Sequence, residues 1–292
     1  MLEHLSDAVV RAGATLCDIG DADALMWADP AAADTFPDVM AQAPNVRWIQ
    51  LPYAGLETFA HHLSPDYVWT CGKGVYADPV AEHVIGLALA GFRNIGAYAT
   101  ARSWGAPVGQ NLIGAKVTIL GGGGITESLL PLLAPFDCTV SVLRRQPREM
   151  PGVDRVVGPD GLDDVLADAD LVVVALSLTP ETRHILDRRT LALMKPNAWL
   201  INVGRGGHIA TDDLVEALRS GVIAGAALDV TEPEPLPTGH PLWDLPNCII
   251  TPHIANTPDM GVVLLAQRVE QNVRRYMAGE ALLGPVDVEL GY

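Results

Sequence analysis

The 292-residue sequence is poor in basic residues, with 19 Lys and Arg against 35 Asp and Glu and a net charge of −16. A phosphate backbone or an anionic membrane surface would be repelled over most of such a surface. We therefore expect no nucleic-acid partner and no membrane partner. An anionic ligand would have to be bound locally, by arginines or by helix N-termini.

Cysteine is scarce too, and the cysteines are scattered. They form no C-x-x-C pair and no Cys/His cluster at ligand spacing, so we expect no structural metal. The pattern also suits a reducing cytoplasm. The four cysteines are Cys17, Cys71, Cys138 and Cys248.

Long apolar runs are missing as well. No run approaches the roughly 20 residues that a membrane helix needs, and the N-terminus lacks a basic region followed by an apolar core. The sequence therefore predicts a cytoplasmic protein that neither spans a membrane nor is exported.

What the sequence does contain is enough apolar surface for a sizeable core. It is 49% hydrophobic and 18% charged, and the apolar segments are spread along the whole chain, which argues against disorder. Since domains usually run to roughly 100–200 residues, we expect two. The patterns described next put one in residues 1–77 plus 260–292 and the other in residues 78–259.

From residue 117 onward, short apolar runs alternate with helix-like segments. The runs are apolar on both faces, as strands of a covered parallel sheet are. Between most of them lie patterns such as TDDLVEALRSG, in which Thr211 would be the N-cap and Gly221 the stop. This alternation predicts an α/β fold with a doubly wound, Rossmann-type parallel sheet. The six runs are VTIL (117–120), TVSVL (139–143), LVVVAL (171–176), AWLINV (198–203), GAALDV (225–230) and CIIT (248–251).

The flanking segments have a different pattern. The first 77 residues carry ADALMWA (22–28), VRWIQLPYAGLE (46–57) and YVWTCGKG (67–74), which predict a smaller α/β unit. We expect one helix over residues 78–104 to connect the two units. A last helix over residues 261–284 would pack back on the first unit.

The run VTIL leads into four consecutive glycines, which suit a dinucleotide-binding turn. In a G-x-G-x-x-G turn the first glycine permits the tight turn and the second lets the backbone approach a pyrophosphate. Gly121 and Gly123 fill these two positions, and Gly124 and Ile125 supply free N–H groups at a helix N-terminus. Thr126 replaces the third glycine, so the helix would stand slightly off the strand. The alternative is an ordinary glycine-rich turn.

The charge after the second strand bears on which dinucleotide would bind. An acidic residue there would bind the ribose 2′-OH of NAD, but this strand runs into Arg144 and Arg145. Arginine pairs well with a 2′-phosphate, so we expect NADP(H), with NAD(H) as the second choice. The alternative is a solvated basic pair at a loop tip.

Three further strands are followed by an arginine, by glutamates and by a histidine. Arg205 follows the fourth strand, Glu232 and Glu234 the fifth and His253 the sixth. Because ligands gather outside the carboxyl ends of parallel strands, these side chains would converge. The set suits hydride transfer to a 2-oxo acid, with a guanidinium for the carboxylate and a histidine as proton donor. Taken singly, they could equally be a capping arginine, solvated glutamates and a core histidine.

These residues resemble those of the D-isomer-specific 2-hydroxyacid dehydrogenases over nearly the whole chain. The most specific stretch is INVGRGGHIATDDLVEALRSGVIAGAALDVTEPEPLP followed by HPLWDLPNCIITPHIANT. PVAEHVIGLALAGFRNI is similar to the family's interdomain helix, and VRWIQLPYAGLE to its substrate loop. The resemblance implies that residues 78–259 bind the dinucleotide and that residues 1–77 plus 260–292 bind the substrate. It also implies a homodimer built largely on the nucleotide domain and the helix from residue 78.

The resemblance assigns a role to each matching position. It makes Arg205, Glu234 and His253 catalytic, and Glu234 rather than Glu232 the partner of the histidine. The implied substrate-binding residues are Ala54, Gly55, Lys73 and Gly74, together with Arg205. The implied cofactor-binding residues are Gly124, Ile125, Arg144, Leu176, Val203, Gly204 and Asp229, the last in the carboxamide region. The glycine turn and the basic pair described above add Gly121, Gly123 and Arg145 to the expected cofactor-binding residues.

The sequence departs from the family pattern at three places. Thr126 replaces the third glycine, and Cys71 and Tyr76 stand where asparagines are usual. The chain also begins inside what looks like the first helix, so we expect a flavodoxin-like substrate domain that lacks its first strand. Either this domain has an altered edge, or the given start is internal to a longer protein.

The reading that best fits these observations is NADPH-linked reduction of glyoxylate, hydroxypyruvate or a similar small 2-oxo acid. NAD-linked oxidation of phosphoglycerate is a second reading, and a non-catalytic NAD(H)-sensing regulator on the same fold is a third.

Overall fold

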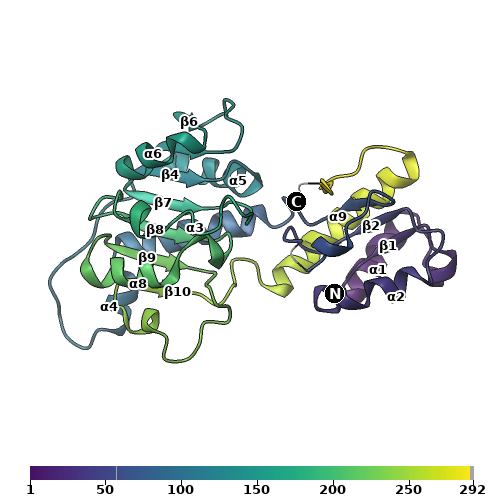
Figure 1. Cartoon of the computed structure of the whole chain (residues 1–292), viewed down its shortest axis with the longest axis horizontal. Coiled ribbons are helices and arrows are strands. Elements are labelled where there is room, and N and C mark those ends of the chain that lie inside the picture. The colour runs from purple at the N-terminus through teal and green to yellow at the C-terminus, as the bar shows by residue number, and fades with distance from the viewer. Residues whose placement is uncertain (57, 290–292) are drawn as a thin grey trace. The chain divides into compact units, whose positions relative to one another are not determined.

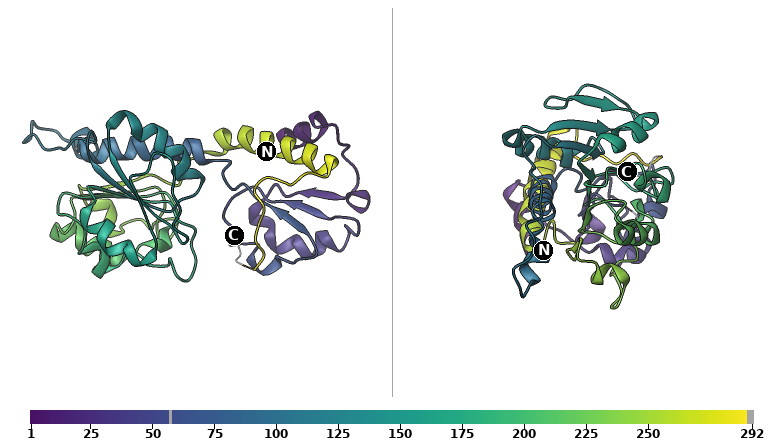
Figure 2. Two further views of the ribbon diagram at one scale, coloured as in Figure 1. Left: turned by 90° about the horizontal axis from the view of Figure 1, so that it is seen from above. Right: turned by 90° about the vertical axis from the view of Figure 1, so that its left-hand side faces the viewer.

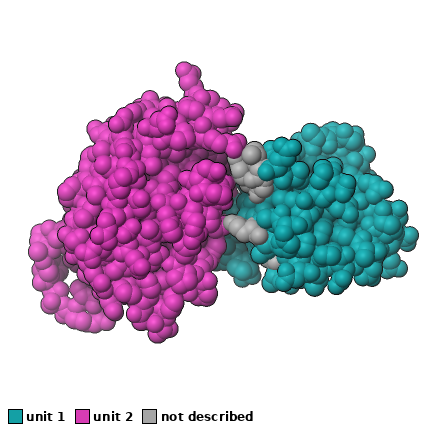
Figure 3. All heavy atoms as spheres, viewed as in Figure 1, with its two compact units in different colours: residues 1–76, 256–292 teal, residues 77–255 magenta. Residues whose placement is uncertain are grey.

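A computed structural model describes residues 1–56 and 58–289. The chain divides into two compact units (Figure 3): Met1–Tyr76 with Asn256–Tyr292, and Ala77–Ala255. We call them unit 1 and unit 2. The junctions expected at 77/78 and 259/260 compare with observed junctions at 76/77 and 255/256.

Unit 2 is built on a seven-stranded sheet in the order β10-β9-β8-β7-β4-β5-β6 (Figure 1), and every strand pair in it is parallel. The predicted doubly wound parallel sheet is therefore confirmed. All six apolar runs form strands, whereas β6 was missed because its RVV sequence is short and only partly buried. The strands are β4 (Lys116–Leu120), β5 (Thr139–Leu143), β6 (Arg155–Val157), β7 (Leu171–Val174), β8 (Trp199–Asn202), β9 (Gly225–Leu228) and β10 (Cys248–Ile250).

Helices cover both faces of this sheet (Figure 2). In β7, Leu171 and Val173 point to one core, packed by α3 and α5, while Val172 and Val174 point to the other, packed by α6, α7 and α8. Alternate residues of a strand point to opposite faces, so both sets must be apolar. The helices are α3 (Ala77–Phe92), α4 (Ile95–Thr100), α5 (Gly124–Leu133), α6 (Leu162–Asp168), α7 (Arg188–Leu191) and α8 (Thr211–Ser220), with short 3₁₀ turns at Ala134–Phe136, Pro159–Gly161, Gly206–His208 and Pro241–Asp244.

Two helix predictions in unit 2 need correction. The helix expected over residues 78–104 is broken after α3, because Asn94 has a left-handed backbone with φ 54° before α4 begins. Thr211 is the first residue of α8, and Ala210 is the N-cap. The Thr211 hydroxyl makes no capping bond and donates instead to the Glu232 carbonyl at 2.6 Å. Gly221 ends α8 at φ 70°, as predicted.

Unit 1 contains a three-stranded parallel sheet in the order β1-β2-β3. One face of this unit packs an aromatic cluster that includes Trp27, Phe36, Phe59 and Trp69, and on the other side α1 packs against α9. No described residue before Ala24 lies in a strand. The elements are α1 (Leu2–Arg11), β1 (Ala24–Met26), α2 (Phe36–Met40), β2 (Trp48–Gln50), β3 (Val68–Thr70) and α9 (Pro258–Ala278), with 3₁₀ turns at Ile19–Asp21, Pro30–Thr35 and Ala60–His62.

The last helix differs from the predicted span of residues 261–284. Thr257 caps the N-terminus of α9 by accepting a bond from the Met260 amide at 3.4 Å, and Gly279 ends the helix with a left-handed backbone at φ 68°. Among the described residues, no helix is both long and apolar enough to cross a membrane.

Candidate active site

The strand order of unit 2 reverses between β4 and β7. Strands β4, β5 and β6 extend to one side of this point, and β7 to β10 extend to the other. At such a switch point the connections leave a crevice at the carboxyl ends of the strands, where ligands bind in open α/β sheets. The glycine loop that follows β4 lies at this point.

The glycine loop has the backbone that a bound phosphate requires. Gly121 has φ +120°, and a Cβ there would collide with the Ala175 carbonyl, which follows β7. Gly123 is the N-cap of α5, and apart from its two chain neighbours no described residue has an atom within 4 Å of a Cβ built on it. The first N–H groups of α5, at Gly124 and Ile125, have no intrahelical acceptor and sit at the positive end of the helix dipole. The loop can therefore receive a pyrophosphate.

Thr126 is accommodated by a hydrogen bond inside this loop. Its side chain is completely buried, and its hydroxyl donates to the Gly121 carbonyl at 2.7 Å. This bond ties the first turn of α5 to the first glycine. The departure from the third glycine thus leaves the backbone amides of the loop in place.

The two arginines after β5 have different surroundings. Arg144 is partly buried, and its Cδ and Nε lie 3.2 and 3.3 Å from a Cβ built on Gly122, so its stem lies along the glycine loop. Arg145 is exposed, and its charge acts on Glu181. Hydrogen bonds, first from Thr179, and the Arg145 charge hold the pKa of Glu181 below its usual value.

Two buried side chains shape the segment that carries Arg205. Asn202, at the end of β8, donates to the Arg205 carbonyl at 2.9 Å and accepts from the Gly204 amide at 3.1 Å. His208 Nδ1 accepts from the Arg205 amide at 3.1 Å, and the Arg205 Nη1 donates to the Gly204 carbonyl at 2.8 Å. Asn202 and His208 are both fully buried. Sequence reasoning missed them, although both lie within the quoted stretch INVGRGGH.

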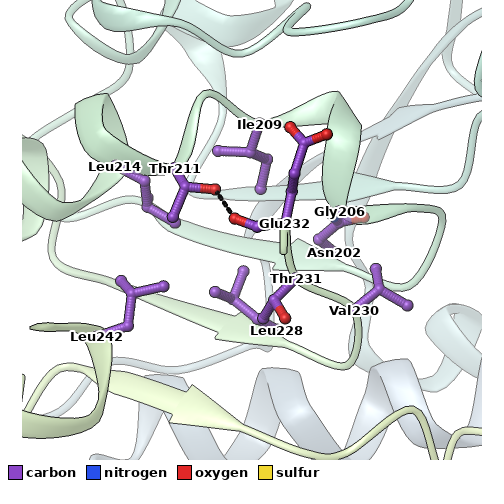
Figure 4. Close-up of a pocket in the computed structure, with 10 residues that line it drawn as sticks. All are labelled: Asn202, Gly206, Ile209, Thr211, Leu214, Leu228, Val230, Thr231, Glu232 and Leu242. Carbon is purple, nitrogen blue, oxygen red and sulfur yellow. Dashed lines mark hydrogen bonds between the residues drawn. The ribbon is translucent and has the colours of Figure 1, made fainter. Parts of the chain in front are cut away.

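The segment after β9 approaches the Arg205 segment closely. A Cβ on Gly206 would collide with the Thr231 carbonyl, so only glycine fits there. Figure 4 shows the small cavity lined by both segments, including Gly206, Thr211 and Glu232. It has room for about one water molecule. This space is too small for a nucleotide, and the Thr211 hydroxyl at the start of α8 bonds the Glu232 carbonyl across it.

The two glutamates after β9 are distinguished by their partners. Glu232 accepts from Arg183 Nη2 at 2.7 Å and from His184 Nε2 at 2.9 Å, and these bonds, that of His184 first, lower its pKa. Glu234 Oε1 lies 2.6 Å from His253 Nδ1. The structure therefore pairs the predicted histidine with Glu234, while Glu232 is held by residues 183–184.

His253 combines exposure with an unusual backbone. Its side chain is 52% exposed, and its φ of 54° lies in the left-handed region, which is uncommon for a residue with a side chain. Its amide donates to the Asp229 carbonyl at 2.8 Å. Because Nδ1 is paired with Glu234, Nε2 is the nitrogen that can exchange a proton with a ligand.

Asp229 is buried beneath the segment that carries His253. Its Oδ1 accepts from the Thr251 hydroxyl at 2.6 Å and from the Ile254 amide at 2.9 Å, and its Oδ2 accepts from the Ala255 amide at 3.0 Å. Burial opposes ionisation, but the nearby His83 and these bonds outweigh it and lower the pKa of Asp229 to about 2. The carboxylate is thus engaged with residues 251–255, and its expected contact with the cofactor carboxamide stays a prediction.

The other predicted cofactor positions lie at the ends of β7 and β8. A Cβ on Gly204 would lie 3.2 Å from the Leu176 carbonyl oxygen, so these two backbones are adjacent. Val203, which follows β8 and precedes Gly204 in the chain, is buried. The carboxyl edge therefore brings together Leu176, Val203, Gly204 and Arg205.

The predicted substrate loops of unit 1 follow β2 and β3 and pack backbone against backbone. The Gly72 amide donates to the Tyr53 carbonyl at 3.0 Å, which places Ala54 and Gly55 near Lys73 and Gly74. Their role in substrate binding stays a prediction.

The two departures in these loops have clear surroundings. Tyr76 donates to the Pro52 carbonyl at 2.6 Å, and Cys71 is buried with its amide donating to the Gly284 carbonyl at 2.8 Å. Arg268 of α9 donates to the Lys73 carbonyl at 3.0 Å. Both substitutions therefore belong to the packing of unit 1. Within residues 1–56 and 58–289, no group of three His, Cys, Asp or Glu side chains could hold a metal ion.

Comparison with known families gives a match over more than half of the chain. Residues 85–255 match the model of the D-isomer specific 2-hydroxyacid dehydrogenase, NAD binding domain. This segment contains the glycine loop, Arg205, Glu234 and His253.

Similar sequences extend the match to the whole chain. An uncharacterized protein of Corynebacterium melassecola is 40% identical over 100% of this chain and 99% of its own length. A glyoxylate reductase of Thermofilum pendens is 34% identical over 91% of this chain and 81% of its own. A glyoxylate/hydroxypyruvate reductase A of Photorhabdus laumondii is 36% identical, and there the match covers 60% of this chain and 56% of the relative.

Solved structures agree with these sequences. A D-isomer specific 2-hydroxyacid dehydrogenase of Xanthobacter autotrophicus in complex with NADPH and MES has a TM-score of 0.86 and 30% identity, with 100% of this chain and 96% of that chain covered. An NADPH-dependent glyoxylate/hydroxypyruvate reductase of Sinorhizobium meliloti in complex with NADP and sulfate has a TM-score of 0.82 and 28% identity, with 100% and 97% covered.

Proposed function

This chain belongs to the D-isomer-specific 2-hydroxyacid dehydrogenases, as its sequence predicted, and on that premise we propose that it reduces small 2-oxo acids with NADPH. The observation that carries the proposal is the 2.6 Å contact between His253 Nδ1 and Glu234 Oε1 on the carboxyl edge of the nucleotide-binding sheet. It gives the chain a histidine that is oriented for proton transfer.

Each of the three polar residues has a defined task in this reaction. A bound nicotinamide would supply the hydride. Protonated His253 would donate the Nε2 proton to the alkoxide that develops on the substrate and become neutral, and Glu234 would stabilise the imidazolium before this transfer. The Arg205 guanidinium would bind the substrate carboxylate and polarise the carbonyl, which its planar fork allows and a lysine would not.

The residues after β4 and β5 fit a dinucleotide that carries a 2′-phosphate. The open space at Gly123 and the N-terminus of α5 suit the pyrophosphate, and Arg144, which lies along the same loop, suits the 2′-phosphate. The NADPH and NADP in the two similar structures support this choice. NAD(H) is the second choice.

The names of the relatives support glyoxylate and hydroxypyruvate as substrates. The test is to mix the purified chain with NADPH and a panel of 2-oxo acids and to follow the loss of absorbance of the reduced cofactor. We expect turnover with at least one of them and its loss in His253→Gln, with His240→Gln as a matched control. Absence of NADPH oxidation with every acid in the panel would refute the proposal and would favour a nucleotide-sensing regulator.

We further propose that the chain is a homodimer. The segment that follows α3 exposes several large apolar side chains, and Trp104 is completely exposed. In Figure 1 the stretch between α4 and β4 extends away from the sheet of unit 2. Such a projecting apolar segment suits burial against a second copy. The exposed side chains are Ile95, Tyr98, Trp104, Val108 and Ile113.

Sedimentation of the wild type and of Trp104→Ser tests the dimer. We expect a dimer for the wild type and a dissociation constant raised about tenfold or more for the variant, since buried aromatic anchors dominate interfaces. A monomeric wild type at micromolar concentration would refute the proposal.

We also propose a cytoplasmic location. Cys17, Cys71, Cys138 and Cys248 are all free thiols in the structure, as a reducing compartment would keep them. Cell fractionation tests this location. Recovery of the protein only in a membrane or secreted fraction would contradict it.

A further inference from the structure

His83 of α3 reaches the strand-end segment that carries His253. Its Nε2 lies 3.1 Å from the Thr251 hydroxyl oxygen and 3.4 Å from Asp229 Oδ1. Its side chain is 21% exposed, and that of Asp229 only 1%. The contact joins a helix on one face of the sheet to the loops after β9 and β10, all within unit 2.

The hydrogen-bond donors in this cluster can be assigned from its chemistry. A carboxylate only accepts, so the Thr251 hydroxyl must be the donor in its 2.6 Å bond to Asp229 Oδ1. The Thr251 oxygen can then only accept from His83, which requires a proton on His83 Nε2. The result is a directed relay in which His83 donates to Thr251 and Thr251 donates to Asp229.

The carboxylate at the end of this relay fixes the backbone on both sides of His253. Asp229 accepts a hydrogen bond from the Thr251 hydroxyl, which precedes His253 in the chain. It also accepts bonds from the amides of Ile254 and Ala255, which follow His253. These bonds hold His253 in its left-handed conformation, which is uncommon for a residue with a side chain.

We propose that His83 is a positioning residue: by donating from Nε2 to the Thr251 hydroxyl it directs that hydroxyl to Asp229 and so holds His253 against Glu234. The inference rests on the proposed function for its kinetic effect, but its structural content concerns the position of His253 alone. No other described charged group is recorded within bonding distance of His83.

The kinetic test uses four variants: His83→Leu, which removes the donor; His83→Gln, which restores an N–H donor; Thr251→Val; and the double variant His83→Leu/Thr251→Val. For His83→Leu we expect kcat to fall about tenfold. Misplacing a catalytic group by about 1 Å can lower the rate about a hundredfold, and His253 should move less than that. The KM for NADPH should stay unchanged, and His83→Gln should recover most of kcat. Because the relay runs through Thr251, the double variant should be no slower than Thr251→Val.

A second readout needs no turnover. The proton shared by His253 Nδ1 and Glu234 should give a low-field NMR signal, identified by its loss in Glu234→Gln. We expect this signal to be lost or shifted in His83→Leu and Thr251→Val but kept in His83→Gln and in the control Glu82→Gln, an exposed neighbour on α3. If the wild type reduces no 2-oxo acid, the proposed function fails while this signal still decides the role of His83. An unchanged signal in His83→Leu, or additive losses of kcat in the double variant, would overturn the inference.

Discussion

Two loops at the carboxyl edge of the same sheet are built in opposite ways. The loop after β10, residues 251–255, is held by the carboxylate of Asp229, which is 2% exposed and lies beneath it. The loop after β5, residues 144–149, is exposed from Arg145 to Glu149, and only Arg144 is partly covered. One loop is fixed by buried hydrogen bonds, and the other lies mostly in solvent.

The difference follows from what each loop has to do in the proposed reaction. Proton transfer requires heavy atoms within hydrogen-bonding distance, so the histidine has to be held in place. Selecting a phosphate requires a positive charge within reach, and an exposed arginine provides it. Changes in the loop after β10 should therefore affect rate and stability, and changes in the loop after β5 should affect cofactor choice alone.

Asp229→Ala should have the largest effect because it leaves several buried donors without an acceptor. Each such donor costs about 1–3 kcal/mol, so we expect the free energy of unfolding to fall by about 3 kcal/mol or more. Activity should be lost with it. Urea denaturation measures the change, with Asp160→Ala, an exposed carboxylate of the same unit, as the control. A loss no greater than that of the control would mean that the loop after β10 is not held as described.

The same carboxylate should make stability depend on acid pH. The pKa of Asp229 lies at about 2, below its ordinary value of 3.8, so its stabilising contribution is present above 3.8 and is lost as the pH falls towards 2. We expect the stability difference between the wild type and Asp229→Asn to shrink over this interval. A difference that stays constant from pH 6 to pH 2 would contradict the assignment.

Glu234→Gln should lower kcat while leaving the free energy of unfolding nearly unchanged. Glu234 and His253 are 41% and 52% exposed, and an exposed pair contributes only about 0–1 kcal/mol to folding. Loss of its charge should lower kcat by about 100-fold, since positioned acid–base groups contribute about 10²–10⁴-fold. Thermal unfolding and steady-state kinetics measure the two effects. If Glu232→Gln lowered kcat equally, the effect on kcat would not depend on the contact between Glu234 and His253.

Arg144→Ser should change only the choice of cofactor. Without the guanidinium, the KM for NADPH should rise about tenfold, as the loss of one charge-assisted contact of about 1.4 kcal/mol implies, while the KM for NADH stays the same. The matched control is Arg148→Ser in the same exposed loop. Equal shifts for both cofactors would place the 2′-phosphate elsewhere.

Thr126→Val should have the smallest effect. It keeps the shape of the side chain but removes the hydroxyl that donates to the Gly121 carbonyl, so we expect a loss of about 1 kcal/mol in the free energy of unfolding. The KM for NADPH should not change, because the phosphate donors are backbone amides. The exposed Thr238→Val serves as the control. A large increase in KM would mean that the threonine shapes the phosphate site directly.

The parts of the fold that sequence predicts well are those whose pattern is local. The six strands with apolar residues on both faces were identified, and β6 was missed because Arg155–Val157 is short and partly exposed. The break between α3 and α4 was missed too, since a single left-handed Asn94 leaves no mark on the hydrophobic pattern.

The parts of the site that escaped prediction depend on contacts between distant residues. The positions of Arg205, Glu234 and His253 follow from strand ends and from the family resemblance. The roles of Asn202, His208 and His83 do not, because each of them is a polar side chain whose meaning comes from what packs against it. His83 reads as an ordinary residue of an apolar helix until α3 is placed beside Asp229.

The strand order of unit 2 also says how this domain should fold. Strands β4, β5 and β6 pair in chain order, as do β7 to β10, so each half needs only short-range loop closure. One pairing, β4 with β7, joins the halves and brings Val117 beside Leu171. Because contacts distant in sequence form slowly, we expect the two halves to form first and their docking along β4 and β7 to limit the folding rate. The glycine loop would then become complete only in that last step, since Gly121 packs against Ala175, which lies just beyond β7.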